Sequence, residues 1–316
     1  MTAPLVPSGA CWVCHHSTLA PIHQPVFDLS IYRHQDPDLA TYSGISITLV
    51  RCSRCGFAQP DSLPALDRFF DRMYDQRWSR DWVISEFDSP AKVRIFEEIL
   101  DGLATRARGS TGRLIDVGAH VGQFIAMARL RGWRAEGLEL NPTTAAYARE
   151  RTGATVHQHP LSTVARDGAV FDALTLIDVL EHIPSPVSIL RDAAAVLKPG
   201  GWIAVKVPCG RSQLVKERLR TALGLTCRVS VADNLVHVSH FSPKALRLAL
   251  EQAGFDRITI GVGRPEQSLA GSAPRRALAN AGRRTMCGVA RLLPAGVHSP
   301  LAFNLQAFAR RDRGTQ

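Results

Sequence analysis

Two carboxylates and two glycines near the middle of the chain have the types and spacing of a nucleoside-binding turn. An apolar run that contains Asp116 ends at Gly118, and a helical pattern begins after Gly122. Glycine lets a backbone pass close to a ligand and presents free N–H groups at a helix start. Glu139 ends a second short strand pattern, where its carboxylate can bind both hydroxyls of a ribose. The pattern predicts nucleoside recognition by a doubly wound sheet.

His120 is the odd member of this turn. Gly118 and Gly122 are separated by three residues, whereas the dinucleotide fingerprint requires G-x-G-x-x-G. His120 stands where a middle glycine is expected. A plain connection between a strand and a helix is the alternative interpretation, so the turn alone does not identify its ligand.

Four cysteines form a second group that could do chemistry. They lie in two C-x-x-C pairs, Cys11 with Cys14 and Cys52 with Cys55. Each pair can form a tight turn with both sulfurs facing one point, and two such turns make a tetrahedral zinc site. The matched pairs, and a glycine after the second, favour zinc over disulfides, which remain the alternative. Four thiolates close the coordination sphere, so we expect a structural zinc ion.

The bulk properties fit a globular protein. The 316 residues suffice for one large core and a small appendage, and 45% hydrophobic with 21% charged residues is ordinary. No apolar run approaches the roughly 18–20 residues of a membrane span. The first residues lack a basic segment followed by an apolar one, so we read no secretion signal and expect a cytoplasmic protein with reduced cysteines.

The positive charge is concentrated near the end of the chain. From Val262 onward nine arginines stand against Glu266 and Asp312, which leaves +3 of the total +10 for all other residues. A helix over 275–293 would place four arginines within about 100° of one face; they are Arg276, Arg283, Arg284 and Arg291. This face is either simply solvated, or it contacts a phosphate group of the substrate or an anionic membrane surface.

The elements around these residues alternate between strand and helix. We expect strands at 113–117, 134–139, 154–157, 171–177, 201–207, 256–262 and 302–310. We expect helices at 121–131, 142–151, 186–197 and 242–253. Such alternation implies a parallel sheet with helices on both faces, and the last two strands suggest a closing hairpin with a long insertion.

The same patterns give a domain organisation. We expect a zinc-binding module at 1–60 with strands at 26–29 and 45–51, and an aromatic helical linker or lid at 61–109. A nucleoside-binding domain follows at 110–316, with the basic insertion at 263–301. Ligands of such sheets bind beyond the carboxyl ends of the strands, where Asp116, Gly118, Glu139 and Asp178 all stand.

With these segments in order, the domain resembles a class I S-adenosylmethionine-dependent methyltransferase. The resemblance spans roughly residues 110–262 and 302–311 and implies a seven-stranded, Rossmann-like α/β sheet. The segments that carry it are, in chain order, 115–122, 137–142, 171–183, 196–202, 205–208, 240–246 and 253–255.

The resemblance assigns roles to the residues of the turn. It implies that Gly118 and Gly122 approach the amino-acid end of S-adenosylmethionine and that Glu139 holds its ribose through strong charge-assisted hydrogen bonds. It implies that Asp116 orients the turn and the ammonium group of the cofactor. His120 then either lines the methionine end of the pocket or points outward.

Two further residues are assigned to the cofactor site by the same comparison. Asp178 ends the fourth strand near the transfer centre. The loop on the adenine side lacks the acid that the family usually has, so backbone groups or Ser162 would recognise adenine.

The cysteine pairs narrow the resemblance to enzymes that methylate nucleotide-linked sugars and related small molecules. Those enzymes carry a histidine-rich run that corresponds here to 233–242, with Val236 where the family has an acid. A further C-terminal domain of the C-methylating members is absent, so O-methylation of a hydroxyl is the simpler expectation. A hydroxyl needs a proton acceptor. His237 is the first candidate, then His182 and His240; a structural role is the alternative for each.

Two other function classes stay open. One is an RNA methyltransferase whose zinc module reads RNA, although residues 1–110 show no dense basic stripe and nucleic acid is not the partner we expect. The other is a non-catalytic zinc-containing interaction protein with a degenerate cofactor fold, for which His120 leaves room. The acceptor, which we expect to be a small molecule or glycan, and the oligomeric state are not encoded in any motif.

Overall fold

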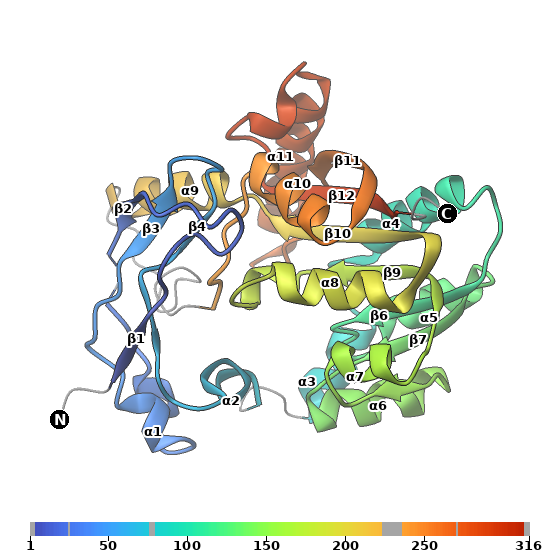
Figure 1. Ribbon diagram of the computed structural model, residues 1–316, viewed down its shortest axis with the longest axis horizontal. Coiled ribbons are helices and arrows are strands. Elements are labelled where there is room, and N and C mark those ends of the chain that lie inside the picture. Colours follow the sequence, from blue (N-terminus) through green and yellow to red (C-terminus); the bar gives the residue numbers. More distant parts are fainter. Residues whose placement is uncertain (1–3, 25, 76–79, 223–235, 270, 313–316) are drawn as a thin grey trace. The chain divides into compact units, whose positions relative to one another are not determined.

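The computed structural model describes residues 4–24, 26–75, 80–222, 236–269 and 271–312 (Figure 1). Its contacts divide the chain into two compact units. The first, which we call the cysteine unit, comprises Met1–Trp78, Leu180–Pro186 and Cys209–Ala249. The second, the sheet unit, comprises Ser79–Val179, Val187–Pro208 and Leu250–Gln316.

The sheet unit contains a seven-stranded sheet in the order β11-β12-β10-β9-β6-β7-β8. Its strands are β6 (Arg113–Val117), β7 (Arg134–Leu138), β8 (Val156–His157), β9 (Phe171–Ile177), β10 (Leu197–Pro208), β11 (Phe255–Gly263) and β12 (Asn304–Arg311). β12 pairs antiparallel with both β10 and β11, whereas the other pairs are parallel. The predicted α/β sheet with a closing hairpin is confirmed.

Helices precede and connect these strands; the helices predicted at 121–131, 142–151, 186–197 and 242–253 are confirmed to within two residues, and a short helix at 161–166 was not predicted. They are α3 (Arg80–Phe87), α4 (Val93–Arg106), α5 (Gln123–Leu130), α6 (Pro142–Thr152), α7 (Leu161–Arg166), α8 (Val187–Val196), α10 (Pro243–Gln252), which runs across the boundary between the units, and α11 (Ala273–Leu292). Side chains of α4, α5 and α6 share one buried apolar cluster with the sheet, which fixes the strand ends of this unit.

Helix α6 illustrates why the sequence sets these boundaries. The Asn141 side chain accepts hydrogen bonds from the backbone N–H groups of Thr143 and Thr144, so two donors of the first turn are satisfied. Pro142 occupies the first helical position, where no N–H is needed. Gly153 ends the helix in the left-handed conformation. The start of α6 therefore lies immediately after Glu139 and β7.

The cysteine unit is built from small antiparallel sheets. Its strands are β1 (Leu5–Pro7), β2 (Leu19–His23), β3 (Leu49–Cys52), β4 (Ala58–Pro60) and β5 (Ser62–Pro64), in the orders β2-β3-β4 and β1-β5. Its helices are η1 (Ser30–Tyr32), α1 (Pro37–Ala40), α2 (Phe69–Asp75), η2 (Leu180–His182) and α9 (Gly210–Ala222). The ring of Phe57 packs against Phe241 with centroids 5.1 Å apart, so distant segments share this core.

The predicted strand at 26–29 is wrong. Val26 makes only an isolated bridge with Ser46, and the strand lies earlier, at β2. The cause is a local turn, because the Asp28 carboxylate accepts hydrogen bonds from both the backbone N–H and the hydroxyl of Ser30. This turn bends the chain into η1. No helix in the described part of the chain is long and apolar enough to cross a membrane.

Candidate functional site

The turn after β6 has the backbone that a close ligand approach requires. Gly118 and Gly122 both have positive φ, at 78° and 82°, a region that residues with a side chain rarely adopt. A Cβ added to Gly118 would lie 2.5 Å from Cγ2 of Val179, so no side chain fits there. Gly122 is the N-cap residue of α5, so the turn leads directly into the start of that helix.

Glu139 is fixed by two backbone N–H groups at the end of β7. The N–H of His120 donates to its Oε2 atom at 2.8 Å, and the N–H of Asn141 donates to Oε1 at 2.9 Å. Burial raises the pKa of Glu139, and these hydrogen bonds offset part of that effect. Each carboxylate oxygen keeps a further lone pair, so Glu139 is oriented to accept from a pair of hydroxyls.

Asp116 lies buried in β6, next to the turn. The hydroxyl of Thr175 donates to its Oδ1 atom at 2.6 Å. Burial and, to a smaller extent, the charge of Glu139 raise the pKa of Asp116 to about 7, against the lowering effects of the Thr175 hydrogen bond and of Lys92. A cation beside Asp116 would favour its charged form, so its environment fits an ammonium group.

His120 takes the left-handed conformation that a glycine would accept without strain. Its φ is 53°, between two glycines that also have positive φ. Burial, together with the positive charge of Lys92, lowers the pKa of His120 to about 4, so the imidazole is neutral at neutral pH. The backbone of His120 serves the site directly, because its N–H holds Glu139.

Asp178, at the end of β9, is held by two lysines. Its Oδ1 atom lies 2.5 Å from Nζ of Lys206, and its Oδ2 atom lies 2.9 Å from Nζ of Lys92. Glu266 approaches both lysines, at 3.8 Å and 3.4 Å respectively. Burial alone would raise the pKa of Asp178, but the two lysine charges outweigh it and hold that pKa below its usual value.

A segment before α4 is tied to the same turn. The side-chain amide of Gln123 donates to the backbone carbonyls of Phe87 and Ser89, at 2.7 Å and 2.8 Å. The ring of Phe87 packs edge-on against Tyr147 of α6. Within the sheet unit, the end of α3 is thus fastened to the start of α5 and to α6. Ser162 lies half-buried in the first turn of α7.

The three candidate histidines gather in the cysteine unit. The rings of His182 and His237 pack at 72° with centroids 4.7 Å apart. Nδ1 of His182 bonds to the carbonyl of Val236 at 2.6 Å, which orients the ring. Ligand atoms of Glu181, His182 and His237 all lie within 4.8 Å of one another. Glu181 follows Asp178 by only three positions in the chain.

Gln213 of α9 joins two of the histidines. Its side-chain amide bonds Nδ1 of His237 at 2.8 Å through one end and Nδ1 of His240 at 3.1 Å through the other. His240 is fully buried, and burial lowers its pKa to about 4. Its backbone pairs in both directions with Ala58 of β4, so His240 also holds the small sheet.

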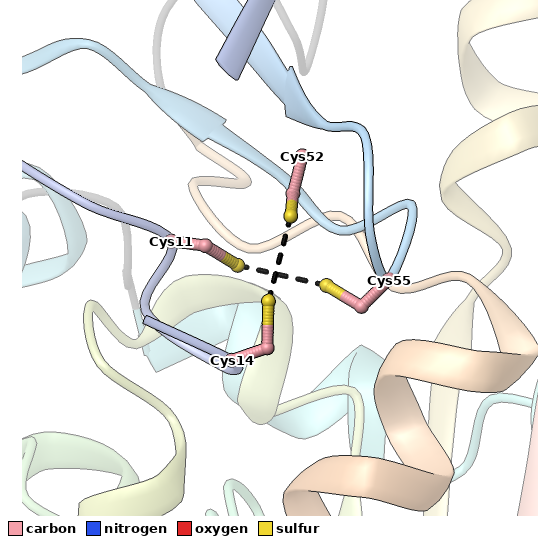
Figure 2. A group of neighbouring side chains, drawn as sticks. All are labelled: Cys11, Cys14, Cys52 and Cys55. Atoms are coloured by element: carbon pink, nitrogen blue, oxygen red, sulfur yellow. Dashed lines mark hydrogen bonds between the residues drawn. The ribbon is translucent and has the colours of Figure 1, made fainter. Parts of the chain in front are cut away.

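The four cysteines converge as expected for a metal centre (Figure 2). Sγ of Cys11 lies 3.6 Å from that of Cys55, and Sγ of Cys14 lies 3.5 Å from that of Cys52. All four sulfurs lie within 4.8 Å of one another. Tetrahedral zinc with Zn–S bonds of about 2.3 Å requires sulfur separations of about 3.8 Å. The cysteines are free thiols, and the cluster fits a structural zinc ion.

Each cysteine pair forms the same turn. The N–H of His15 donates to the carbonyl of Cys11, and the N–H of Gly56 donates to that of Cys52. The residue after each pair has positive φ, 56° at His15 and 74° at Gly56. Two independent segments therefore present their sulfurs through one backbone geometry, which is what a closed four-thiolate site needs.

Several residues of these sites escaped the sequence analysis. Lys206 interrupts an apolar strand, and a charged residue at a buried strand position is a signal that a partner must exist. Lys92 and Glu266 stand far from it in the sequence, in segments without a motif. Gln213 also carries no local signal, because only the fold brings it to His237 and His240.

Comparisons with known proteins agree with this geometry. The sequence profile of the family described as "Methyltransferase domain" matches residues 91–260, more than half of the chain. A ubiquinone biosynthesis O-methyltransferase of Chromobacterium violaceum is 26% identical over 140 residues, which cover 42% of this chain and 58% of that protein. One of Xanthomonas campestris pv. campestris is 36% identical over 111 residues, 33% of this chain and 46% of that protein.

Among solved structures, the plantazolicin methyltransferase BamL, in complex with a triazolic desmethylPZN analogue and S-adenosylhomocysteine, superposes with a TM-score of 0.51. It is 14% identical and covers 76% of this chain and 94% of its own. At this identity the likeness concerns the fold. The family profile shows that the chain belongs to the methyltransferase domain family, and the superposition shows that it has the fold of an S-adenosylmethionine-dependent methyltransferase.

Proposed function

We propose that this protein transfers a methyl group from S-adenosylmethionine to a hydroxyl of a small molecule or of a nucleotide-linked or lipid-linked sugar. The observation that carries the cofactor half of this proposal is the fixed carboxylate of Glu139, held by the N–H groups of His120 and Asn141. The relatives named above are O-methyltransferases, which supports a hydroxyl acceptor. The chain matches only about half of the length of these relatives. We therefore infer the acceptor class from the residues of the site and not from the relatives' substrates.

The residues of the turn would hold the cofactor. Glu139 accepts hydrogen bonds from the two ribose hydroxyls, and the glycines at 118 and 122 let the backbone approach the methionine end. Asp116 offers its second oxygen to the ammonium group. Ser162 and the N–H groups at the start of α7 are the donors on the adenine side. When bound, S-adenosylmethionine supplies an electrophilic methyl group on a sulfonium centre.

The protein must then orient the acceptor, exclude water and remove one proton. In this proposal His237 accepts the proton of the hydroxyl at Nε2, which requires its own proton on Nδ1. The amide nitrogen of Gln213 faces Nδ1 of His237 in the structure, so this tautomer requires the amide group to be flipped, with its oxygen accepting the Nδ1–H. His182 is the second candidate base. The burial of His240 favours a supporting role for it, beside Gln213.

The cysteine cluster has a structural part in this scheme. Zinc bound by Cys11, Cys14, Cys52 and Cys55 leaves no open coordination position for a substrate. Its bond energy would hold the turn before β2 and the turn before β4, and hence the pairing of Ala58 with His240.

Three measurements test the proposal in sequence. Calorimetric titration with S-adenosylmethionine should give binding that Glu139→Ala abolishes; no binding by the wild-type protein would favour a non-catalytic interaction protein. Release of S-adenosylhomocysteine with a panel of sugar nucleotides and phenols then identifies the acceptor class. His237→Ala should lower kcat by about 100-fold or more while cofactor affinity is retained. Near-normal turnover of that variant would remove His237 from the role.

A further inference from the structure

Helix α11 carries an apolar face that nothing in the described part of the chain covers. Leu278 is 76% exposed and Leu292 is 87% exposed, and Val289 lies between them at 43%. At about 100° per residue these three side chains fall within about 60° of each other around the helix. The helix is 20 residues long and contains no acidic residue. A helix face that only contacts water does not need large apolar side chains, so these three residues point to a binding partner.

The opposite side of α11 packs against the rest of the sheet unit. Cys287 and Ala290 are buried in a small apolar cluster with Val262 of β11. The side chain of Asn280 bonds both the N–H and the carbonyl of Ser268, at 2.7 Å and 3.1 Å. These contacts fix which face of the helix points outward.

Two of the arginines also belong to the inner side. Arg291 pairs with Glu98 at 2.6 Å and donates to the carbonyl of Val262. Arg283 donates to the carbonyl of Glu266 at 3.1 Å. The arginine face expected from the sequence therefore helps to fasten α11 to the sheet unit, and the leucines, rather than these arginines, point into solvent.

Of the other three arginines of α11, Arg276 donates to the carbonyl of Leu269. Arg275 and Arg284 are exposed, border the apolar face on its two sides at helical spacing, and form no ion pair with any described residue. An apolar centre with cationic borders is the distribution of a helix that lies in a membrane interface. The borders suit phosphate headgroups, because guanidinium binds phosphate oxygens in pairs.

We propose that the outer face of α11, formed by Leu278, Val289 and Leu292 with Arg275 and Arg284 beside them, docks on an anionic phospholipid surface. Charge selects this occupant. A second copy of the chain in two-fold contact would bring the cationic borders of one helix beside those of the other, with no acid on the helix to pair them. A nucleic acid would gain nothing from the apolar centre.

The position of α11 in the sheet unit would link membrane docking to the edge of the sheet where the cofactor residues lie. The segment that leads from β11 to α11 contains Glu266, which approaches Lys92 and Lys206 at the carboxyl edge of the sheet. Arg283 of α11 holds the backbone of that same residue. The docking face thus stands on an element fastened beside the edge where the cofactor residues lie. The proposal does not depend on the identity of the acceptor.

Vesicle co-sedimentation of the full chain tests the docking. We expect binding to vesicles of equal parts phosphatidylglycerol and phosphatidylcholine to be at least about tenfold stronger than to phosphatidylcholine alone, and to weaken with salt. Leu278→Ser with Leu292→Ser should weaken it by about tenfold or more, because two apolar side chains are lost. Arg275→Ala with Arg284→Ala should remove the preference for anionic vesicles. Leu130→Ser is the matched control, since Leu130 is 88% exposed on α5.

Circular dichroism and cofactor titration establish that each variant is folded. Vesicle binding that is unchanged in the double leucine variant overturns the proposal, as does failure of the wild-type protein to bind anionic vesicles. A wild-type dimer that becomes a monomer in the leucine variant assigns the face to self-association instead. Equal loss of binding in Leu130→Ser would show a general effect of surface polarity and would also overturn it.

Discussion

Glu139 and Asp178 end two strands of one sheet at the same edge, yet their surroundings differ in kind. Glu139 is held by two neutral N–H groups, from His120 and Asn141, and its pKa is raised by burial. Asp178 is held by two ammonium groups, and its pKa is depressed. Among the described residues the Glu139 carboxylate therefore has no cationic partner and can bind a ligand, whereas the negative charge of Asp178 pairs with Lys92 and Lys206.

This difference separates a binding role from a supporting one. A carboxylate oriented by dipoles can still exchange solvent for ribose hydroxyls. A carboxylate that neutralises the buried Lys206 cannot leave without stranding that charge. We therefore expect Glu139 to govern cofactor affinity and Asp178 to govern the stability of the carboxyl edge.

The largest expected effect comes from Asp178→Asn. Asparagine accepts the φ of 58° at this position, so the change removes charge with little backbone strain. The free energy of unfolding should fall by about 3–5 kcal/mol, because buried Lys206 loses its nearest carboxylate and keeps only the more distant Glu266. Urea denaturation measures it. Asp172→Asn, at the other end of β9 in the more exposed pair with Lys198, should cost under about 1 kcal/mol. Similar losses in both variants would contradict this account.

Glu139→Gln should act on binding instead. The amide places an N–H group where a backbone N–H now donates, and it weakens the charge-assisted bonds to the ribose. The Kd for S-adenosylmethionine should rise by about 10- to 100-fold in calorimetry. Glu150→Gln, an exposed change on α6, serves as control. If Glu139→Gln loses more stability than affinity, the contrast with Asp178 fails.

The dependence of stability on pH tests how burial affects the charged groups beside Glu139. The raised pKa of Asp116, about 7 against an ordinary value near 3.8, favours the folded state at low pH, and this contribution disappears as the pH rises from about 4 to 7. Asp116→Asn should therefore remove a decline in stability over that range.

The lowered pKa of His120, about 4, acts with the opposite sign. Its contribution is present above the ordinary value of 6.5 and disappears as the pH falls towards 4. His120→Asn should remove that loss. Thermal melts across the range separate the two groups, and parallel profiles for both variants would refute the assignments.

The smallest effect belongs to His120→Gly. A glycine adopts the φ of 53° freely, so relief of strain competes with the greater entropy of an unfolded glycine. We expect stability to change by less than about 1 kcal/mol and the Kd for cofactor to change little, because the N–H that holds Glu139 remains. A large loss of affinity would show that the imidazole itself binds the cofactor.

Much of the sheet unit could be predicted from the sequence because its signals are local. The strands at 113–117 and 171–177 begin and end as expected, and Asn141 with Gly153 marks α6 at both ends. The spacing of the cysteine pairs likewise predicted the cluster of sulfurs in the cysteine unit. In each case neighbouring residues alone determine the backbone.

What escaped prediction depends on contacts between distant segments. Lys92 and Asp178 are 86 positions apart, and Gln213 reaches two histidines from a helix without a motif. The outward face of α11 is a further case. Its periodicity gave the helix, but the side that carries Cys287 and Ala290 was set by packing on β11. Periodicity fixes which residues share a face, and tertiary contacts decide where that face points.

The chain enters the cysteine unit three separate times, and this has a consequence for how the enzyme can be divided. Residues 180–186 and 209–249 complete a unit begun by the first 78 residues, and Ala58 bonds the backbone of His240. Removing residues 1–60 would strip His240 of its strand partner and uncover Phe241. The metal-bearing segment is therefore no detachable accessory. A chimaera that exchanges the cysteine unit with that of a relative must carry all three segments together.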